Sequence, residues 1–261
     1  MKYITLENSS RIRYERIDGV QDNPWLIFLH EGLGCVEMWK DFPAQLCLKT
    51  GCPGLVYDRC GYGYSSPEAG TRGIDYIHSY ALLELPQVIQ AILPGKKHIL
   101  IGHSDGGSIS LVYASRPHRG LLGIVVEAAH VFVEPITLQG IRQADEAYAE
   151  YGPGKLVRYH GVNTDTVFRA WADTWLRDSF GQWNIESLLP DITCPALVLQ
   201  GEDDQYGTDR QVKAIVSQVA GEATKHILPG CGHAPHREQP EVVLALVRKF
   251  VSDLATAHPS S

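Results

Sequence analysis

One serine lies where the sequence pattern favours nucleophilic chemistry. The segment Gly102–Gly106 reads GHSDG; it follows the short apolar run 98–101 and precedes the apolar stretch 109–114. Glycines two residues to either side of a serine, between a buried strand and a helix, allow a turn so tight that the hydroxyl projects at the positive end of the helix. The pattern therefore predicts Ser104 as a nucleophile.

A serine hydroxyl reacts poorly at neutral pH unless a base with a pKa near 7 takes its proton and a third group orients that base. Candidates for both roles follow later in the chain. The acidic residues 202–204 come directly after the apolar run 196–200, and His233 comes soon after the strand-like run 226–228. The order serine, acid, histidine differs from the orders of the chymotrypsin and subtilisin types.

The elements around these residues follow a repeating pattern. Short continuous apolar runs, typical of strands buried on both faces of a parallel sheet, are separated by helical stretches. The runs are 25–29, 55–57, 98–101, 123–126 and 196–199. The segments 3–6 and 11–17 alternate apolar and polar residues and predict an antiparallel hairpin. The chain is therefore predicted to be an α/β protein whose site lies at the carboxyl edge of its sheet.

The alternation breaks between residues 130 and 185, where helical stretches carry nine of the 23 aromatic residues of the chain. We expect an α/β core formed by residues 1–129 and 186–261, and a helical cap formed by residues 130–185 over the carboxyl edge. Two or three of the nine rings are expected in the pocket. The last four residues, 258–261, are expected to be a frayed tail.

With these motifs the sequence resembles the α/β-hydrolase-fold serine hydrolases, a group that includes esterases, C–C hydrolases and cofactor-free haloperoxidases. It also has the His-Gly-type segment HEGLG at 30–34 and the pattern Asp-x-x-Gly-x-Gly-x-Ser at 58–65. The resemblance covers nearly the whole chain and implies an α/β-hydrolase fold with a mostly parallel central sheet, flanking helices and a helical cap insertion.

The resemblance also assigns the partners of Ser104. It implies His233 as the base and Asp204 as the acid, with the adjacent Asp203 as the alternative. Glu127 follows another strand run, where some members of this fold keep their acid, and is expected to be structural because residues 201–204 already supply the common acid position.

An oxyanion hole is implied as well, formed by the backbone N–H groups of Gly32 and Asp105. Glu31 departs from the family, which more often has glycine there. It is either a solvated or structurally hydrogen-bonded carboxylate, or a group that binds a polar part of the substrate. His103 is expected to pack beside the nucleophile and to border the pocket.

Composition disfavours several kinds of partner. The 261 residues include 23 Lys and Arg against 30 Asp and Glu, a formal net charge of -7 without a basic run, which disfavours nucleic acids and anionic membranes.

The N-terminus lacks the apolar stretch of a signal peptide, and the six cysteines lack metal or disulfide spacing, so a cytoplasmic location with mostly reduced thiols is expected. His233 and His236 could suggest a metal pair, but the intervening Pro235 and the lack of a third ligand argue against it. We expect no metal or cofactor, and a monomer or homodimer acting on a small-molecule substrate.

The expected activity is hydrolysis of a carboxylic ester of a small, apolar or aromatic substrate through an acyl-enzyme on Ser104. Two alternatives use the same residues: C–C bond hydrolysis of a ring-cleavage diketone, and lactone cleavage. A weakly catalytic, ligand-binding signalling receptor is the alternative from another class.

Overall fold

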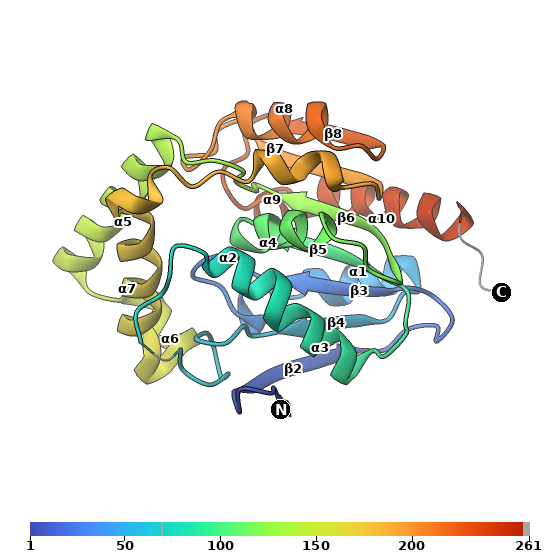
Figure 1. The fold of residues 1–261 in the computed structure, drawn as a ribbon, viewed down its shortest axis with the longest axis horizontal. Coiled ribbons are helices and arrows are strands. Elements are labelled where there is room, and N and C mark those ends of the chain that lie inside the picture. Colours follow the sequence, from blue (N-terminus) through green and yellow to red (C-terminus); the bar gives the residue numbers. More distant parts are fainter. Residues whose placement is uncertain (69, 258–261) are drawn as a thin grey trace.

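The computed structural model describes residues 1–68 and 70–257 (Figure 1). The tail expected over 258–261 lies outside the described residues. Within the described part, eight strands form one sheet in the order β1-β2-β4-β3-β5-β6-β7-β8. The strands are β1 Lys2–Thr5, β2 Arg11–Ile17, β3 Trp25–Leu29, β4 Gly54–Tyr57, β5 His98–His103, β6 Leu121–Glu127, β7 Ala196–Gly201 and β8 Ala223–Leu228.

Strand direction follows the two sequence patterns. The alternating segments form the antiparallel pair β1 and β2, and β2 also runs antiparallel to β4. The continuous apolar runs form the parallel strands β3 to β7, and β8 pairs in parallel with β7. The predicted hairpin, the predicted parallel sheet and the α/β class are therefore confirmed.

Helices cover both faces of this sheet (Figure 1). The core helices are α1 Phe42–Thr50, α2 Tyr76–Ser79, α3 Leu85–Ile92, α4 Asp105–Ala114, α8 Asp209–Gln218, α9 Pro235–Glu238 and α10 Pro240–Ala257. Short 3-10 turns are η1 Val36–Trp39, η3 Gly154–Leu156, η4 Gly161–Asn163, η5 Asp178–Phe180 and η6 Glu186–Asp191, and η2 Tyr80–Glu84 is a π-helical turn.

Two apolar layers result from the alternation of side chains along each strand. In β3, Leu26 and Phe28 face the layer formed with α1 and α10, while Ile27 and Leu29 face the layer formed with α3, α4 and α8. Because both faces are covered, all five side chains of β3 are buried.

The segment of residues 130–185, which we call the helical insertion, leaves the sheet after β6 and returns before β7. It contains α5 Pro135–Tyr151, α6 Val157–His160 and α7 Thr164–Trp175, which lie together at one end of the molecule (Figure 1). A bridge between Phe132 and Asn184 joins its two ends.

All six cysteines lie within the described residues and are free thiols. No helix of the described chain combines the length and the apolar character needed to cross a membrane.

Candidate functional site

The turn between β5 and α4 holds Ser104 in an unusual backbone conformation, with φ 52° and ψ -116°. The left-handed region is unfavourable for residues other than glycine, so the surrounding packing must hold the serine there. The neighbouring glycines make this packing possible. A Cβ on Gly106 would lie 1.9 Å from the carbonyl oxygen of Leu29, and a Cβ on Gly102 would lie 2.2 Å from that of Gly106.

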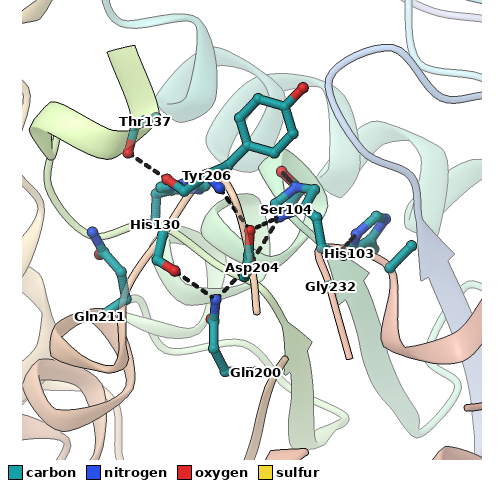
Figure 2. A network of polar contacts seen from close by, with 12 residues as sticks. His103, Ser104, His130, Thr137, Gln200, Asp204, Tyr206, Gln211 and Gly232 are labelled. Atoms are coloured by element: carbon teal, nitrogen blue, oxygen red, sulfur yellow. Dashed lines mark hydrogen bonds and ion pairs between the residues drawn. The ribbon is translucent and has the colours of Figure 1, made fainter. Parts of the chain in front are cut away.

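The side chains of Ser104, His233 and Asp204 meet at this turn. Ser104 Oγ lies 3.0 Å from His233 Nε2, and His233 Nδ1 lies 2.9 Å from both carboxylate oxygens of Asp204. Because a carboxylate only accepts hydrogen bonds, Nδ1 carries the hydrogen and Nε2 is free to accept one from the serine hydroxyl. Figure 2 shows Ser104 and Asp204 within the same polar network.

Asp204 is held from the end of β7. It accepts hydrogen bonds from the Tyr206 N–H at 2.8 Å and from the Gln200 side chain (Figure 2). Burial raises the pKa of Asp204, but the hydrogen bond and the charge of His233 outweigh burial and hold the pKa below its usual value. The alternative acid, Asp203, is exposed, and its N–H bonds to the carbonyl oxygen of Cys231 at 2.8 Å. Of the two adjacent acids, the structure thus brings Asp204 to the histidine.

Glu127 belongs to a second, separate carboxylate–imidazole pair. Its Oε2 accepts hydrogen bonds from His236 Nδ1 at 2.9 Å and from the His236 N–H at 3.1 Å, and both side chains are buried. His233 and His236 therefore face different carboxylates.

Among the described residues, one group of possible metal ligands clusters closely: Cys35, Glu37 and Asp58. The Arg13 guanidinium lies 2.7 Å from Glu37 and 3.4 Å from Asp58. A cation of the protein itself thus already lies beside these acids.

His103 and Glu31 form a carboxylate–imidazole pair beside His233. His103 Nε2 donates to the backbone carbonyl oxygen of His233 at 2.7 Å, and His103 Nδ1 lies 3.4 Å from Glu31 Oε2. Burial lowers the pKa of His103, but the Glu31 carboxylate more than compensates and raises that pKa above its usual value. For Glu31, burial raises the pKa, but the interaction with His103 outweighs burial and holds the pKa below its usual value. Glu31 is therefore structurally paired, and it also borders the pocket.

A cavity of about 230 Å³ opens onto Ser104. Gly32 and Asp105 border it, so the two predicted oxyanion donors lie beside the nucleophile; their role stays a prediction. Of the nine aromatic residues of the helical insertion, Trp171 and Trp175 line this cavity. The cavity is also lined by Glu31, Leu33, His103, His130, Thr137, Ile141, Gln205, Tyr206, His233, Ala234, Arg237 and Glu238.

Three residues with clear roles in the site were not predicted. The Tyr206 ring lies 4.8 Å from the His233 ring, and the Tyr206 carbonyl accepts a hydrogen bond from His130 Nε2 at 3.0 Å. Burial lowers the pKa of His130, and nearby His233 lowers it further. Tyr76, the first residue of α2, donates a hydrogen bond to Asp105. The position of Tyr206 two residues after Asp204 is the one sequence signal that points to any of them.

Comparisons with known proteins bear on the family and the fold of the chain. The model of the family described as "Alpha/beta hydrolase family" matches residues 26–246. A 2-succinyl-6-hydroxy-2,4-cyclohexadiene-1-carboxylate synthase from Enterobacter sp. (strain 638) is 28% identical, over 87% of this chain and 92% of its own length.

Solved structures share the fold at lower identity. A carboxylesterase of the ammonia-oxidizing Thaumarchaeon Nitrososphaera gargenis superimposes with a TM-score of 0.77 at 19% identity, over 98% of this chain and 100% of its own. A serine hydrolase involved in carbazole degradation gives a TM-score of 0.74 at 18% identity, over 96% of this chain and 99% of its own.

Proposed function

Because the chain belongs to the alpha/beta hydrolase family and is an enzyme of hydrolase type, we propose that it is a serine hydrolase that cleaves carboxylic esters of small, apolar or aromatic substrates. The observation that carries the proposal is the 3.0 Å contact between Ser104 Oγ and His233 Nε2 at the border of the cavity.

The proposed reaction is acyl transfer in two halves. His233 takes the proton of Ser104 as the oxygen attacks the ester carbonyl, and Asp204 keeps His233 in the reactive tautomer. The N–H groups of Gly32 and Asp105 stabilise the oxyanion, and His233 passes its proton to the leaving alcohol. Water, activated by His233, then cleaves the acyl-enzyme and restores the free serine.

The pocket supports a substrate with an apolar part. Trp171 and Trp175, with Ile141 and Leu33, give the cavity apolar walls, and polar side chains line the rest of it. We propose that the helical insertion acts as the cap that shapes this pocket.

The test combines turnover with labelling. The purified protein should hydrolyse short p-nitrophenyl esters over many turnovers, and a fluorophosphonate should label Ser104, as mapped by mass spectrometry. Ser104→Ala should keep the folded circular dichroism spectrum and lose both activities. Multiple turnovers would contradict a ligand-binding receptor, whereas labelling of Ser104→Ala would contradict the proposed nucleophile.

The curated relative supports a second candidate, the synthase activity that its name describes. This is checked by assaying formation of 2-succinyl-6-hydroxy-2,4-cyclohexadiene-1-carboxylate beside the ester panel. A ring-cleavage diketone and a set of lactones in the same panel would distinguish C–C and lactone hydrolysis from ester hydrolysis.

A further inference from the structure

Asp105 places a carboxylate at the wall of the pocket, one residue after the nucleophile. Its side chain is buried, at 2% exposure, in the first turn of α4. Asp105 Oδ2 lies 3.2 Å from the point that a Cβ on Gly32 would occupy, and Trp171 Cδ1 lies 2.6 Å from the same point. The carboxylate, Gly32 and Trp171 therefore meet at one corner of the cavity that Ser104 borders.

Neutral groups hold this carboxylate in place. Its Oδ2 accepts a hydrogen bond from the Tyr76 hydroxyl at 2.9 Å, and the Tyr76 oxygen accepts one from Trp175 Nε1 at 2.8 Å. In the described part of the chain, Tyr76 is the one side-chain donor to Asp105, and Asp105 takes part in no ion pair. Since a carboxylate has about four acceptor positions, Asp105 keeps unused capacity beside the cavity.

In the described part of the chain, nearby cations make no hydrogen bond or ion pair with Asp105. The Arg59 guanidinium donates to the carbonyl oxygens of His30 and Glu31, and it acts on Asp105 through its charge alone. His103 is paired with Glu31, the second carboxylate of the pocket wall. The remaining basic side chain of the lining, Arg237, is exposed and follows His236 in α9, next to the acidic Glu238.

A negative charge close to the oxyanion hole has a chemical consequence. It opposes the negative charge that develops on the carbonyl oxygen during acyl transfer, and the interaction is strong where water is excluded. A hydrogen-bond donor on the substrate, above all an ammonium group, would offset this charge when bound. A substrate carboxylate at the same place would add to the repulsion.

We propose that Asp105, assisted by Glu31, selects acyl substrates that carry an ammonium or another hydrogen-bond donor close to the scissile carbonyl, and rejects substrates that carry a carboxylate there. The inference rests on the proposed function, because it assigns selectivity to acyl transfer at Ser104.

Esters of matched size test this preference. The p-nitrophenyl esters of β-alanine, butyrate and succinate place an ammonium, a methyl and a carboxylate at the same distance from the carbonyl. Butyrylcholine and 3,3-dimethylbutyl butyrate make the same comparison on the alcohol side. All rates are corrected for spontaneous hydrolysis. In at least one of the two series, kcat/KM should be at least ~10-fold higher for the cationic ester than for the neutral ester. It should also be ~10-fold lower for the succinyl ester than for the butyryl ester.

Variants connect the preference to the residue. In Asp105→Asn the ratio of cationic to neutral kcat/KM should fall by at least ~10-fold, and in Glu31→Gln by a smaller factor. Asp203→Asn is the matched control, because it removes an exposed carboxylate that neither lines the cavity nor contacts His233; its ratio should equal that of the parent protein. The ratio compares two substrates on one protein, so a lower folded fraction does not change it.

The outcomes separate the two proposals. Turnover of the neutral esters without a charge preference, or an unchanged ratio in Asp105→Asn, overturns the specificity role and leaves the serine hydrolase intact. Absence of both ester turnover and Ser104 labelling overturns the proposed function. If Ser104 is labelled but no ester is turned over, the rate of labelling is measured in the presence of butylammonium, butanol or butyrate. Slower labelling with butylammonium than with the other two supports the preference, and equal rates overturn it.

Discussion

His233 connects the reactive groups of the site through bonds in three directions. Its Nε2 faces Ser104, its Nδ1 faces Asp204, and its backbone carbonyl accepts from His103. The ring is thus fixed by the carboxylate, and the main chain is fixed by a second imidazole that is itself paired with Glu31. This arrangement presents one ring nitrogen to the serine in a single orientation.

The two adjacent acids give a prediction at this scale. Asp204→Asn should lower kcat by about 10⁴-fold, because an amide favours the wrong tautomer of the histidine. Asp203→Asn should change kcat by less than about twofold, since its side chain is exposed. Steady-state ester hydrolysis measures both. A large loss in Asp203→Asn with near-normal turnover in Asp204→Asn would reverse the assignment of the acid.

Sequence could predict the residues whose roles depend on local pattern. The glycines around Ser104 and the strand ends before Asp204 and His233 are visible in the chain itself. The pairing of Glu31 with His103 and of Tyr76 with Asp105 is not visible, because each joins side chains that are far apart in sequence. Such contacts depend on tertiary structure and on no single spacing.

At the scale of elements, the approach of α4 to β3 determines where the nucleophile lies. Gly106 lets the first turn of α4 touch the end of β3, where any side chain would collide with the main chain at Leu29. Since Leu29 is held in the sheet and Gly106 in helix α4, the strain cannot be relieved by one rotamer change.

Gly106→Ala should therefore destabilise the protein by about 3 kcal/mol or more and lower ester turnover further than the loss of folded protein explains. Urea denaturation and active-site titration measure the two effects. Gly207→Ala serves as the control, because the nearest atom to its added Cβ lies 3.4 Å away, an ordinary contact. Equal stability of Gly106→Ala and the parent would refute a required close approach.

The strands were predictable because burial on both faces leaves continuous apolar runs, as in Trp25–Leu29. The π-helical turn Tyr80–Glu84 was not predictable, because it depends on how Glu84 and its neighbours pack against the loop at Cys60. Local propensity gives no signal for such a turn.

At the scale of the whole molecule, this buried Glu84 links stability to pH. Its Oε2 accepts the Cys60 N–H at 3.0 Å, and burial raises the pKa of Glu84 to about 7, from an ordinary value of 4.5. Between these two values the folded protein binds a proton that the unfolded chain releases. The contribution of Glu84 to the free energy of unfolding is therefore highest below pH 4.5. It falls as the pH rises and levels off above pH 7.

Glu84→Gln removes this titration and should keep the hydrogen bond to Cys60. The gain in free energy of unfolding over the parent should be about 2 kcal/mol larger at pH 8 than at pH 5. Urea denaturation at both pH values measures the difference. Glu222→Gln, at an exposed position, is the control; it should change the free energy of unfolding by the same small amount at both pH values. A gain from Glu84→Gln that does not depend on pH would contradict a proton held in the fold.

The helical insertion starts and ends at neighbouring strands. β6 and β7 pair in parallel from Ile124 with Ala196 to Glu127 with Leu199, and the bridge between Phe132 and Asn184 brings the two connections together. Recombination at these two points could exchange one insertion for another while the sheet keeps its register and Ser104 its position. Over evolution, the aromatic wall of the pocket can thus diversify as a module, whereas Glu31 and Asp105 are inherited with the core.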